Sequence, residues 1–571
     1  MTALGRLSRL WPFGVRVDPD YRRAIAYLGW EIRPERLLRV SRGGATFLGA
    51  IGGIALLTGL LHPNRSMLTF GGVLLGVACA IERLGARGPL GLAALKRTAA
   101  VGAVPALVGY AVLHARIFAN PEGAAAFAAN TDDGPLARSL RGHVHRTRDV
   151  DRSALIAFGE EWASWFPELR RATALIETAA DAPAGRRERT LDRAMAAVTD
   201  GTRDRMAGFA GDVRGPATAL YAFGVVVPLA LIGVLPAARI AGIPVSIRSL
   251  IAVYVVVLPG ALVIAGWWLL VRRPIAFPRP TVGRDHPSVP DRTWPSIAAA
   301  GALGIGAAVA AAVVVAQWTW PIALVGIGVG IALRTRYAPI VAVHERTRAV
   351  EDGLPDALYL LGRRISDGTA PETAIESTAD DLTGPAGAVL REVAGVQRRL
   401  GVGIEEALLG EYGAVASLPS PRLRAAATLL EVTVSEGRPA GIVVVATATH
   451  LDELRAVERD ARDDLAQITD TLGNTAAVFG PLVAGATVAM ADGIASAGTP
   501  ADVPTATPLP TDALGLVVGT YTLLLAAILT AIAVALERGF DRALIGERVG
   551  TAMTVATGIY LVSVAIAGAL V

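Results

Sequence analysis

The chain has 571 residues, of which 53% are hydrophobic and only 18% are charged, and its formal net charge is +4. Together with a mean hydropathy of +0.48, this composition excludes a wholly soluble or disordered chain. It indicates an all-α polytopic membrane protein with sizeable soluble insertions. We expect the lipid bilayer, and no nucleic acid, among its partners.

The N-terminal segment, residues 1–42, carries nine Arg and lacks the short apolar core of a signal peptide. Arg-rich segments beside a span stay on the inner side of the membrane. We therefore expect an uncleaved, cytoplasmic N-terminus. Trp11 and Trp30 suit a segment that lies against the inner leaflet, but an ordinary juxtamembrane tail explains them equally well.

Charge-free windows long enough to cross a bilayer core of about 30 Å mark the membrane spans. These windows are 43–64, 66–81, 215–238, 249–271, 293–333, 471–491, 513–536 and 549–571. The window 293–333 needs two spans, with a turn at 317–321, because Trp and Pro there are typical of a membrane edge. We expect nine transmembrane helices, which lie in a hairpin at 43–83, a pair at 216–271, a hairpin at 296–334, a pair at 473–536 and a last span at 551–571.

The first hairpin contains two small-residue spacings, Gly49 to Gly53 and Gly72 to Gly76, and its turn falls at 62–64. Such spacings let helix backbones approach closely. Glycine is common in membrane helices, so the pattern assigns no specific contact.

Two long polar blocks, 84–215 and 335–472, show helical periodicity interrupted by Pro and Gly. We expect each to form a helical bundle, the first with five or six helices. Trp162, Trp165 and Phe166 in the first block could form a docking patch, but their helical spacing favours core packing. The Pro-rich linker at 272–295 should join the two halves without regular structure.

Arg placement predicts the topology. The linker 272–295 holds five Arg and a short loop at 537–550 holds three, whereas the loop 493–511 holds none. Both bundles should therefore be cytoplasmic and the C-terminus outside the cell membrane. Arg239 and Arg248, in a predicted outer loop, are a mild exception.

The two blocks differ in charge: 84–215 carries +3 and 335–472 carries −8. Opposite signs could draw the bundles together or direct one of them toward a basic partner. Alternatively, these are two solvated surfaces whose charges drifted apart, because fold constrains surface charge weakly.

Part of the pattern occurs twice. An offset of 250 residues places Val104-Pro105 on Leu354-Pro355 and Pro121-Glu122 on Pro371-Glu372. An offset of 254 places 169–177 on 423–431. This predicts a parallel internal duplication in which each half is two spans, a bundle and two more spans.

Enzyme chemistry has little support in the sequence. The only lysine, Lys96, follows Leu95 and not Gly, so it is not part of a Walker loop. His143 and His145 point to different faces of a helix, and Cys79 is alone. We expect no catalytic, cofactor-binding or metal-binding residue. None of the spans has an ionisable residue near its centre, which disfavours an ion-coupled transporter.

The second block carries further motifs: Leu354-Pro355, Asp367-Gly368, Pro371-Glu372, a run at 401–408 that begins Gly-x-Gly-Ile-Glu-Glu, and Glu436-Gly437. This pattern resembles the type II secretion F family, the membrane platforms of type IV pili, type II secretion systems, tight-adherence pili and the archaellum. The resemblance covers 354–495 and, more weakly, 104–237, where 401–403 is replaced by Asp-Arg-Ser at 151–153. Nine spans and the N-terminal additions look more like the archaeal members.

The resemblance implies a non-enzymatic platform that couples a cytoplasmic assembly ATPase to prepilin handling, and a homodimer is the family expectation. Charged turns of the second bundle are candidate ATPase contacts. We select Asp367, Glu372, Glu405 and Glu406. The alternatives are a parallel-repeat transporter and a membrane scaffold or sensor with helical cytoplasmic domains.

Overall fold

The computed structural model describes residues 14–61, 65–131, 134–147, 153–240, 246–275, 277, 282, 286–290, 294–416, 418–435, 440–496 and 510–570. Across these ranges the regular structure is entirely helical. Nine of the helices there are long and apolar enough to cross a membrane. The expected all-α fold is thereby confirmed for the described residues, as is the expected number of apolar helices long enough to span a membrane. The turn predicted at 62–64 and most of the loop 493–511 lie outside these ranges.

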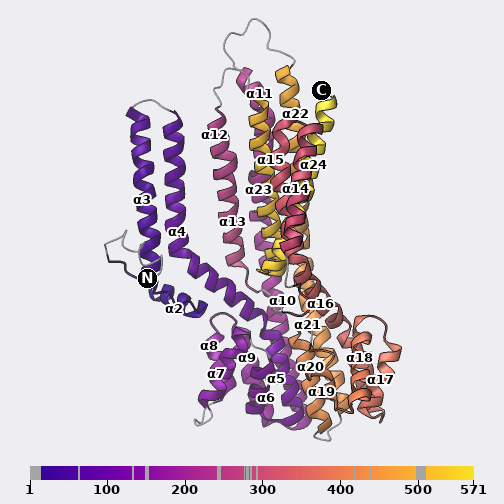
Figure 1. Cartoon of the computed structure of the whole chain (residues 1–571). Coiled ribbons are helices and arrows are strands. Elements are labelled where there is room, and N and C mark those ends of the chain that lie inside the picture. The colour runs from indigo at the N-terminus through magenta and orange to yellow at the C-terminus, as the bar shows by residue number, and fades with distance from the viewer. Residues whose placement is uncertain are drawn as a thin grey trace.

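The chain begins with a short helix, α2 (Pro19–Leu28), which is capped by the Asp18 carboxylate and ends at Gly29 with φ 72°. A hairpin follows, made of α3 (Pro34–Leu61) and α4 (Arg65–Gly102). Helix α4 bends where Pro89 lies inside it and then runs toward the first bundle (Figure 1). Helix α2 packs on α4 just before this bend, through a hydrogen bond from the Tyr21 hydroxyl to the Gly85 carbonyl oxygen.

The first bundle contains six helices, the upper of the two expected numbers. They are α5 (Val104–Phe118), α6 (Pro121–Thr131), α7 (Pro135–Thr147), α8 (Ala154–Trp162), α9 (Pro167–Ala180) and α10 (Ala184–Tyr221). Helix α10 continues through a π-helical turn, η2 (Ala222–Val226), into the apolar α11 (Val227–Ile240). The next span consists of α12 (Ile247–Ile251), η3 (Ala252–Val257) and α13 (Leu258–Arg272).

The second half starts with α14 (Trp294–Val314), a 3₁₀ turn η4 (Gln317–Thr319), and the continuous run α15 (Trp320–Ala323), η5 (Leu324–Val329) and α16 (Gly330–Ser366). The turn expected at 317–321 is therefore confirmed. Five more helices complete the second bundle: α17 (Pro371–Asp381), α18 (Pro385–Leu400), α19 (Ile404–Leu409), α20 (Pro421–Ser435) and α21 (Ala440–Asn474).

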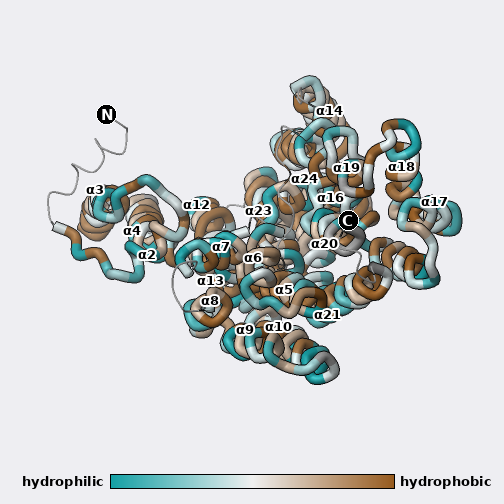
Figure 2. The backbone as a smooth tube through the Cα atoms, turned by 90° about the horizontal axis from the view of Figure 1, so that it is seen from below, coloured by the Kyte–Doolittle hydropathy of each residue, from teal (hydrophilic) through white to brown (hydrophobic). Residues whose placement is uncertain are grey.

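Three apolar helices end the chain. They are α22 (Gly480–Ser496), which continues from α21 through η6 (Thr475–Phe479), then α23 (Thr511–Arg538) and α24 (Arg542–Leu570). The free end of α24 lies at the end of the membrane helices farthest from the bundles (Figure 1). In the view from below, the bundle helices show more hydrophilic colour than the membrane helices behind them (Figure 2).

Four of the expected domain boundaries fall inside helices. The positions 84, 215, 334 and 472 lie within α4, α10, α16 and α21, each of which runs unbroken from the apolar part into a bundle or toward it. A helix satisfies its own backbone hydrogen bonds, so it can pass from lipid to water without a loop. Continuous helices, and not loops, therefore join the apolar part to the bundles.

The loop expected at 537–550 is a wrong prediction. Only 539–541 separate α23 from α24. Gly539, with φ 83°, ends α23, and the Asp541 carboxylate accepts the backbone N–H groups of Ala543 and Leu544 at 2.9 and 3.2 Å. This N-cap starts α24 before its long apolar stretch begins. The charge pattern alone did not indicate this helix start.

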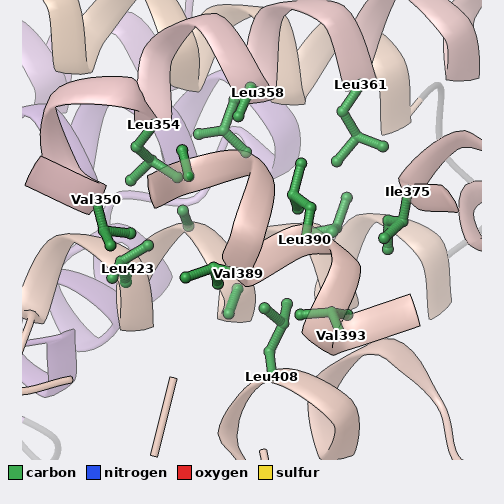
Figure 3. A pocket seen from close by; sticks show the side chains of 15 residues that line it. Val350, Leu354, Leu358, Leu361, Ile375, Val389, Leu390, Val393, Leu408 and Leu423 are labelled. Carbon is green, nitrogen blue, oxygen red and sulfur yellow. The ribbon is translucent and has the colours of Figure 1, made fainter. Parts of the chain in front are cut away.

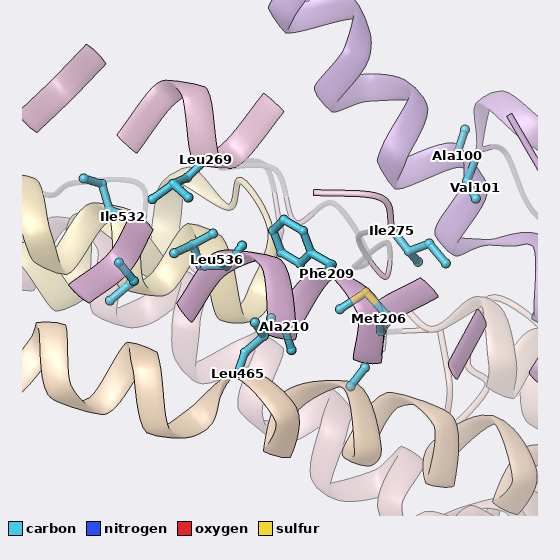
Figure 4. Close-up of a cluster of buried hydrophobic side chains, with 14 of the residues drawn as sticks. Ala100, Val101, Met206, Phe209, Ala210, Leu269, Ile275, Leu465, Ile532 and Leu536 are labelled. Carbon is cyan, nitrogen blue, oxygen red and sulfur yellow. The ribbon is translucent and has the colours of Figure 1, made fainter. Parts of the chain in front are cut away.

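The largest hydrophobic core runs from the first bundle into the membrane helices. Figure 4 shows side chains of α4, α10, α13, α21 and α23 meeting there, together with Ile275 from the linker. Trp162 and Phe166 are buried in this core, whereas Trp165 is 40% exposed beneath the Arg97 guanidinium. Core packing is thus confirmed for two of the three aromatic residues. The described parts of the linker, 273–275, 277, 282 and 286–290, are irregular, as expected.

Candidate functional site

The turn between α16 and α17 carries two of the four selected residues. Gly368, with φ 92°, ends α16, and its N–H bonds back to the Ile365 carbonyl oxygen. Asp367 and Glu372 flank this turn and are exposed. Since α16 descends from the membrane (Figure 1), the turn lies at the end of the second bundle farthest from the spans.

The other two selected residues lie on α19. Gly401, with φ 65°, ends α18, and α19 follows after two further residues. Glu406 is exposed, while the side chain of Glu405 lies outside the described part of the structure. Because α17 returns toward the membrane and α18 descends again, the turn before α19 lies at the same distal end as Asp367 and Glu372.

Nearby charged residues are engaged in ion pairs that hold α16, α17 and α18 together. Arg364 of α16 binds Asp381 and donates 2.7 Å to the Thr378 hydroxyl. Arg398 of α18 binds Glu376 of α17. Among the described residues, no ion pair includes Asp367, Glu372 or Glu406. Their carboxylates are therefore available to a partner.

The two bundles contact each other where α5 and α10 meet α21. His450 of α21 is buried against Gly109 of α5, where an added Cβ would overlap the imidazole. The Tyr110 ring meets the same imidazole edge-on, with ring centroids 6.2 Å apart. Burial, reinforced by the nearby Arg116 and Arg422 guanidinium groups, lowers the pKa of His450 to about 3. The ring is therefore neutral in this interface.

Most of the interface is apolar. Leu113 and Ile117 of α5 share a buried cluster with Leu429 of α20, and Met195 of α10 belongs to the core of the second bundle. One ion pair between the bundles is found among the described residues, from Arg203 of α10 to Asp460 of α21 at 3.0 Å. The bundles do pack together, but apolar burial contributes more to this contact than opposite net charge does.

A charged cluster lies where α16, α20 and α21 meet near the membrane. Arg422 binds Glu458 and lies 3.5 Å from Glu351, and between 12% and 21% of these three side chains is exposed. Glu351 also accepts a hydrogen bond from the Ser420 hydroxyl. Burial by itself would lower the pKa of Arg422, but the Glu458 and Glu351 carboxylates together raise it above its ordinary value. Arg422 therefore keeps its positive charge in the cluster.

Arg273 provides a second buried cation at this level. It follows α13 and is 3% exposed. Its Nη1 donates 2.9 Å to the Ala535 carbonyl oxygen at the end of α23, where the helix dipole favours a positive charge. Burial lowers the pKa of Arg273 to about 10, with Glu537 opposing and Arg462 adding to the shift. Arg273 thus links the last turns of α13 and α23.

The core of the second bundle encloses an apolar cavity of about 50 Å³. Figure 3 shows Leu354 and Leu358 of α16, Val389 and Leu390 of α18, and Leu423 of α20 around it. A cavity of this kind has no polar group with which to orient a ligand or a water molecule. The cavity lowers the packing density between α18 and α16 and is not a substrate site.

His143 and His145 are separated as their spacing predicted. His143 is buried, and its Nε2 lies 2.6 Å from a Glu161 carboxylate oxygen, whereas His145 is exposed. Within the described ranges, no group of three His, Cys, Asp or Glu side chains is placed to hold a metal ion. This histidine contributes to the packing of α7 on α8.

Sequence reasoning missed the charged cluster and His450. Glu351, Arg422 and Glu458 are 36 to 107 residues apart, so only the packing of three helices reveals them as neighbours. A usable signal existed for Ser420, which precedes Pro421 and fits a helix N-cap.

Comparison with protein families, with curated proteins and with solved structures found no match to this chain.

Proposed function

We propose that this chain is the membrane platform of a type IV pilus-like assembly or secretion machine, similar to the type II secretion F family. In this proposal both bundles lie in the cytoplasm and receive a conformational push from an assembly ATPase. The continuous helices pass that push to prepilin-like subunits in the cell membrane. The N-terminus is cytoplasmic and the C-terminus is outside.

The observation that carries the proposal is the repeated path from bundle to membrane. Helices α10 and α21 each leave a six-helix bundle and enter the apolar region through a π-helical turn, at 222–226 and 475–479. π-Turns are frequent at functional positions in helices. A displacement of either bundle is thereby delivered directly to a membrane helix, without an intervening loop.

Helix boundaries support the internal duplication. Helices α6 and α17 begin at Pro121 and Pro371, and α7 and α18 begin at Pro135 and Pro385, both at an offset of 250 residues. The same offset relates Pro89 inside α4 to Pro339 inside α16. Prolines that begin or bend equivalent helices constrain the backbone alike.

One contact between the bundles fits a paired arrangement of the two halves. Arg203 is residue 20 of α10, and its partner Asp460 is residue 21 of α21. Helices that meet at nearly equivalent positions form a self-complementary contact, as in a symmetric dimer. One chain can therefore supply the paired bundles that two copies of a shorter protein would provide.

The ATPase contact is assigned to the distal end of the second bundle, at Asp367, Glu372, Glu405 and Glu406. We expect charge reversal of Asp367 and Glu372 to Lys to weaken ATPase pull-down at least tenfold. The matched control reverses Asp352, an exposed acid of α16 that lies 3.4 Å from Arg455. Unchanged pull-down after reversal of all four acids would remove this surface from the proposal.

The function itself is tested by deleting the gene. We expect surface filaments, examined by electron microscopy, to disappear and to return when the gene is supplied on a plasmid. Intact filaments in a strain without a paralogue would sink the proposal. Substrate uptake by the purified protein in liposomes would favour the transporter alternative.

A further inference from the structure

The ninth apolar helix, α24, fills a place in the second half of the molecule. It packs along α16, α22 and α23. Its contact with η5 and the start of α16 is close because Gly326 and Gly330 have no side chains there. A Cβ on Gly326 would overlap the Thr557 hydroxyl, and one on Gly330 would lie 2.8 Å from the Gly550 carbonyl oxygen. Small residues allow membrane helices to approach in this way.

The corresponding helix of the first half, α4, has an open face. Gly76 lies 250 residues before Gly326, the offset that also relates Pro89 to Pro339. Within the described structure, no atom lies within 4 Å of a Cβ built on Gly76 or Gly72. Cys79, on the same helical face, is also exposed. Gly326 contacts α24 in the second half, whereas Gly76, its counterpart in the first half, is uncovered.

The hairpin partner does not use this face. Helix α3 meets α4 through Gly52 and Gly71, where an added Cβ on Gly71 would lie 2.7 Å from the Gly52 carbonyl oxygen. The small-residue spacing at 72–76 is therefore not what closes the hairpin. On its other side, α4 meets α13 where Trp267 packs against Gly91, below the bend. Helix α4 also contacts α12 and η3, but not through Gly72 or Gly76, whose Cβ positions have no described neighbour within 4 Å.

We propose that a membrane-spanning helix of a separate polypeptide packs on α4 along Gly72, Gly76 and Cys79, in the place that α24 holds in the second half. The inference rests on the internal duplication proposed above, and it does not require filament assembly. The glycines let the backbone of a partner helix approach closely and make extensive van der Waals contact. A lipid acyl chain gains no more contact from a glycine than from a larger apolar residue.

The chemistry of the partner follows from α24. It should be an apolar helix of about 20 residues without a charge at its centre. It should also present small or hydroxyl residues at the spacing of Gly550, Thr554 and Thr557. The chain's own α24 is not available, because Tyr560 of α24 is fully buried and donates 2.8 Å to the Gly515 carbonyl oxygen of α23.

Cys79 allows a direct test because it is the only cysteine in the chain. A thiol-reactive benzophenone is attached to Cys79 in membranes of the cells that make the protein, and photo-adducts are sequenced by mass spectrometry. We expect an adduct within an apolar, membrane-spanning stretch of another polypeptide. The matched control carries Cys79→Ala with Gly301→Cys, because Gly301 of α14 also has no described atom within 4 Å of its Cβ position. It should label lipid only.

A substitution tests whether the glycine face is the contact. We expect Gly76→Leu to leave the melting temperature unchanged and to reduce the polypeptide adduct at least tenfold, whereas Gly301→Leu leaves it intact. If Gly76→Leu lowers the melting temperature, Gly72→Leu provides the same comparison. The proposal is overturned by adducts at Cys79 that contain only lipid or only this same chain. Adducts that persist in a stably folded glycine variant overturn it too.

These outcomes separate the two proposals. Lipid-only labelling in cells whose filaments depend on the gene would reject the helix-binding face and leave the platform function standing. A polypeptide adduct in cells whose filaments survive deletion of the gene would do the reverse.

Discussion

The two bundles have different side chains where α9 begins beside α10 in the first bundle and where α20 begins beside α21 in the second. We call this place the corner of each bundle. At the end of the second bundle nearest the membrane helices, Arg422 lies between Glu351 and Glu458, beside Ser420. The residue that precedes α9 in the first bundle, as Ser420 precedes α20, is the buried Phe166. Residue 19 of α21 is Glu458, and residue 19 of α10 is the buried Thr202.

The first bundle also has an ion pair at its corner. There the acid and the base have exchanged helices, and both side chains are more exposed to solvent. Glu168, the second residue of α9, binds Arg205 of α10 at 3.0 Å, and about 30% of each side chain is exposed. Arg422 is the second residue of α20. Helix packing thus fixes where the corner lies, whereas either ionic or apolar side chains can occupy it.

Breaking the buried cluster should have the largest effect. We expect Arg422→Met to lower the free energy of unfolding by about 3 kcal/mol, because Glu351 would lose its ion-pair partner and Glu458 would keep only Arg462. Chemical unfolding of the purified protein in detergent measures this loss. Arg455→Met, which removes an exposed pair with Asp352, is the control and should cost less than about 1 kcal/mol. Equal losses would mean that the cluster is effectively solvated.

Replacing the cluster as a whole should cost less than breaking it. The triple variant Glu351→Met, Arg422→Leu and Glu458→Met leaves none of these three charges and approaches the apolar corner of the first bundle. We expect its free energy of unfolding to lie within about 2 kcal/mol of the parent protein, since apolar replacement of buried ion pairs is often tolerated. A triple variant less stable than Arg422→Met would contradict the equivalence of the two corners.

Acid should weaken the contact between the bundles through His450. Its pKa is 6.5 in the unfolded chain and about 3 in the folded one, so the unfolded state binds the extra proton. Stability is complete above pH 6.5 and falls between pH 6.5 and 3, by up to about 1.4 kcal/mol per pH unit. When the free energy of unfolding is measured from pH 7.5 to 5, the His450→Gln variant should lack this slope. The exposed His145→Gln should retain it.

The exposed pair of the first bundle should matter least. We expect Arg205→Met to change the free energy of unfolding by less than about 1 kcal/mol, because both side chains reach solvent. The Arg205 guanidinium also covers the Phe166 ring, 4.8 Å from its centroid, and Met retains most of that apolar cover. A loss near that of Arg422→Met would show that the two ion pairs are equivalent after all.

Local patterns in the sequence determined the parts of this protein that depend on neighbouring residues. The charge-free windows predicted nine apolar helices, and α6, α9, α17 and α20 each begin at a proline. Each of these signals acts within a few residues, through transfer into lipid or through a fixed φ angle.

Tertiary structure alone decided what depends on distant residues. It brings Arg422 to Glu351, and His450 to Gly109, because three helices or two bundles must pack before these groups meet. It also leaves Gly76 open where Gly326 is covered by α24, although the two glycines lie in similar sequence. Composition and periodicity report how much of a helix is buried, but not which surface buries it, because burial is a property of the assembled helices.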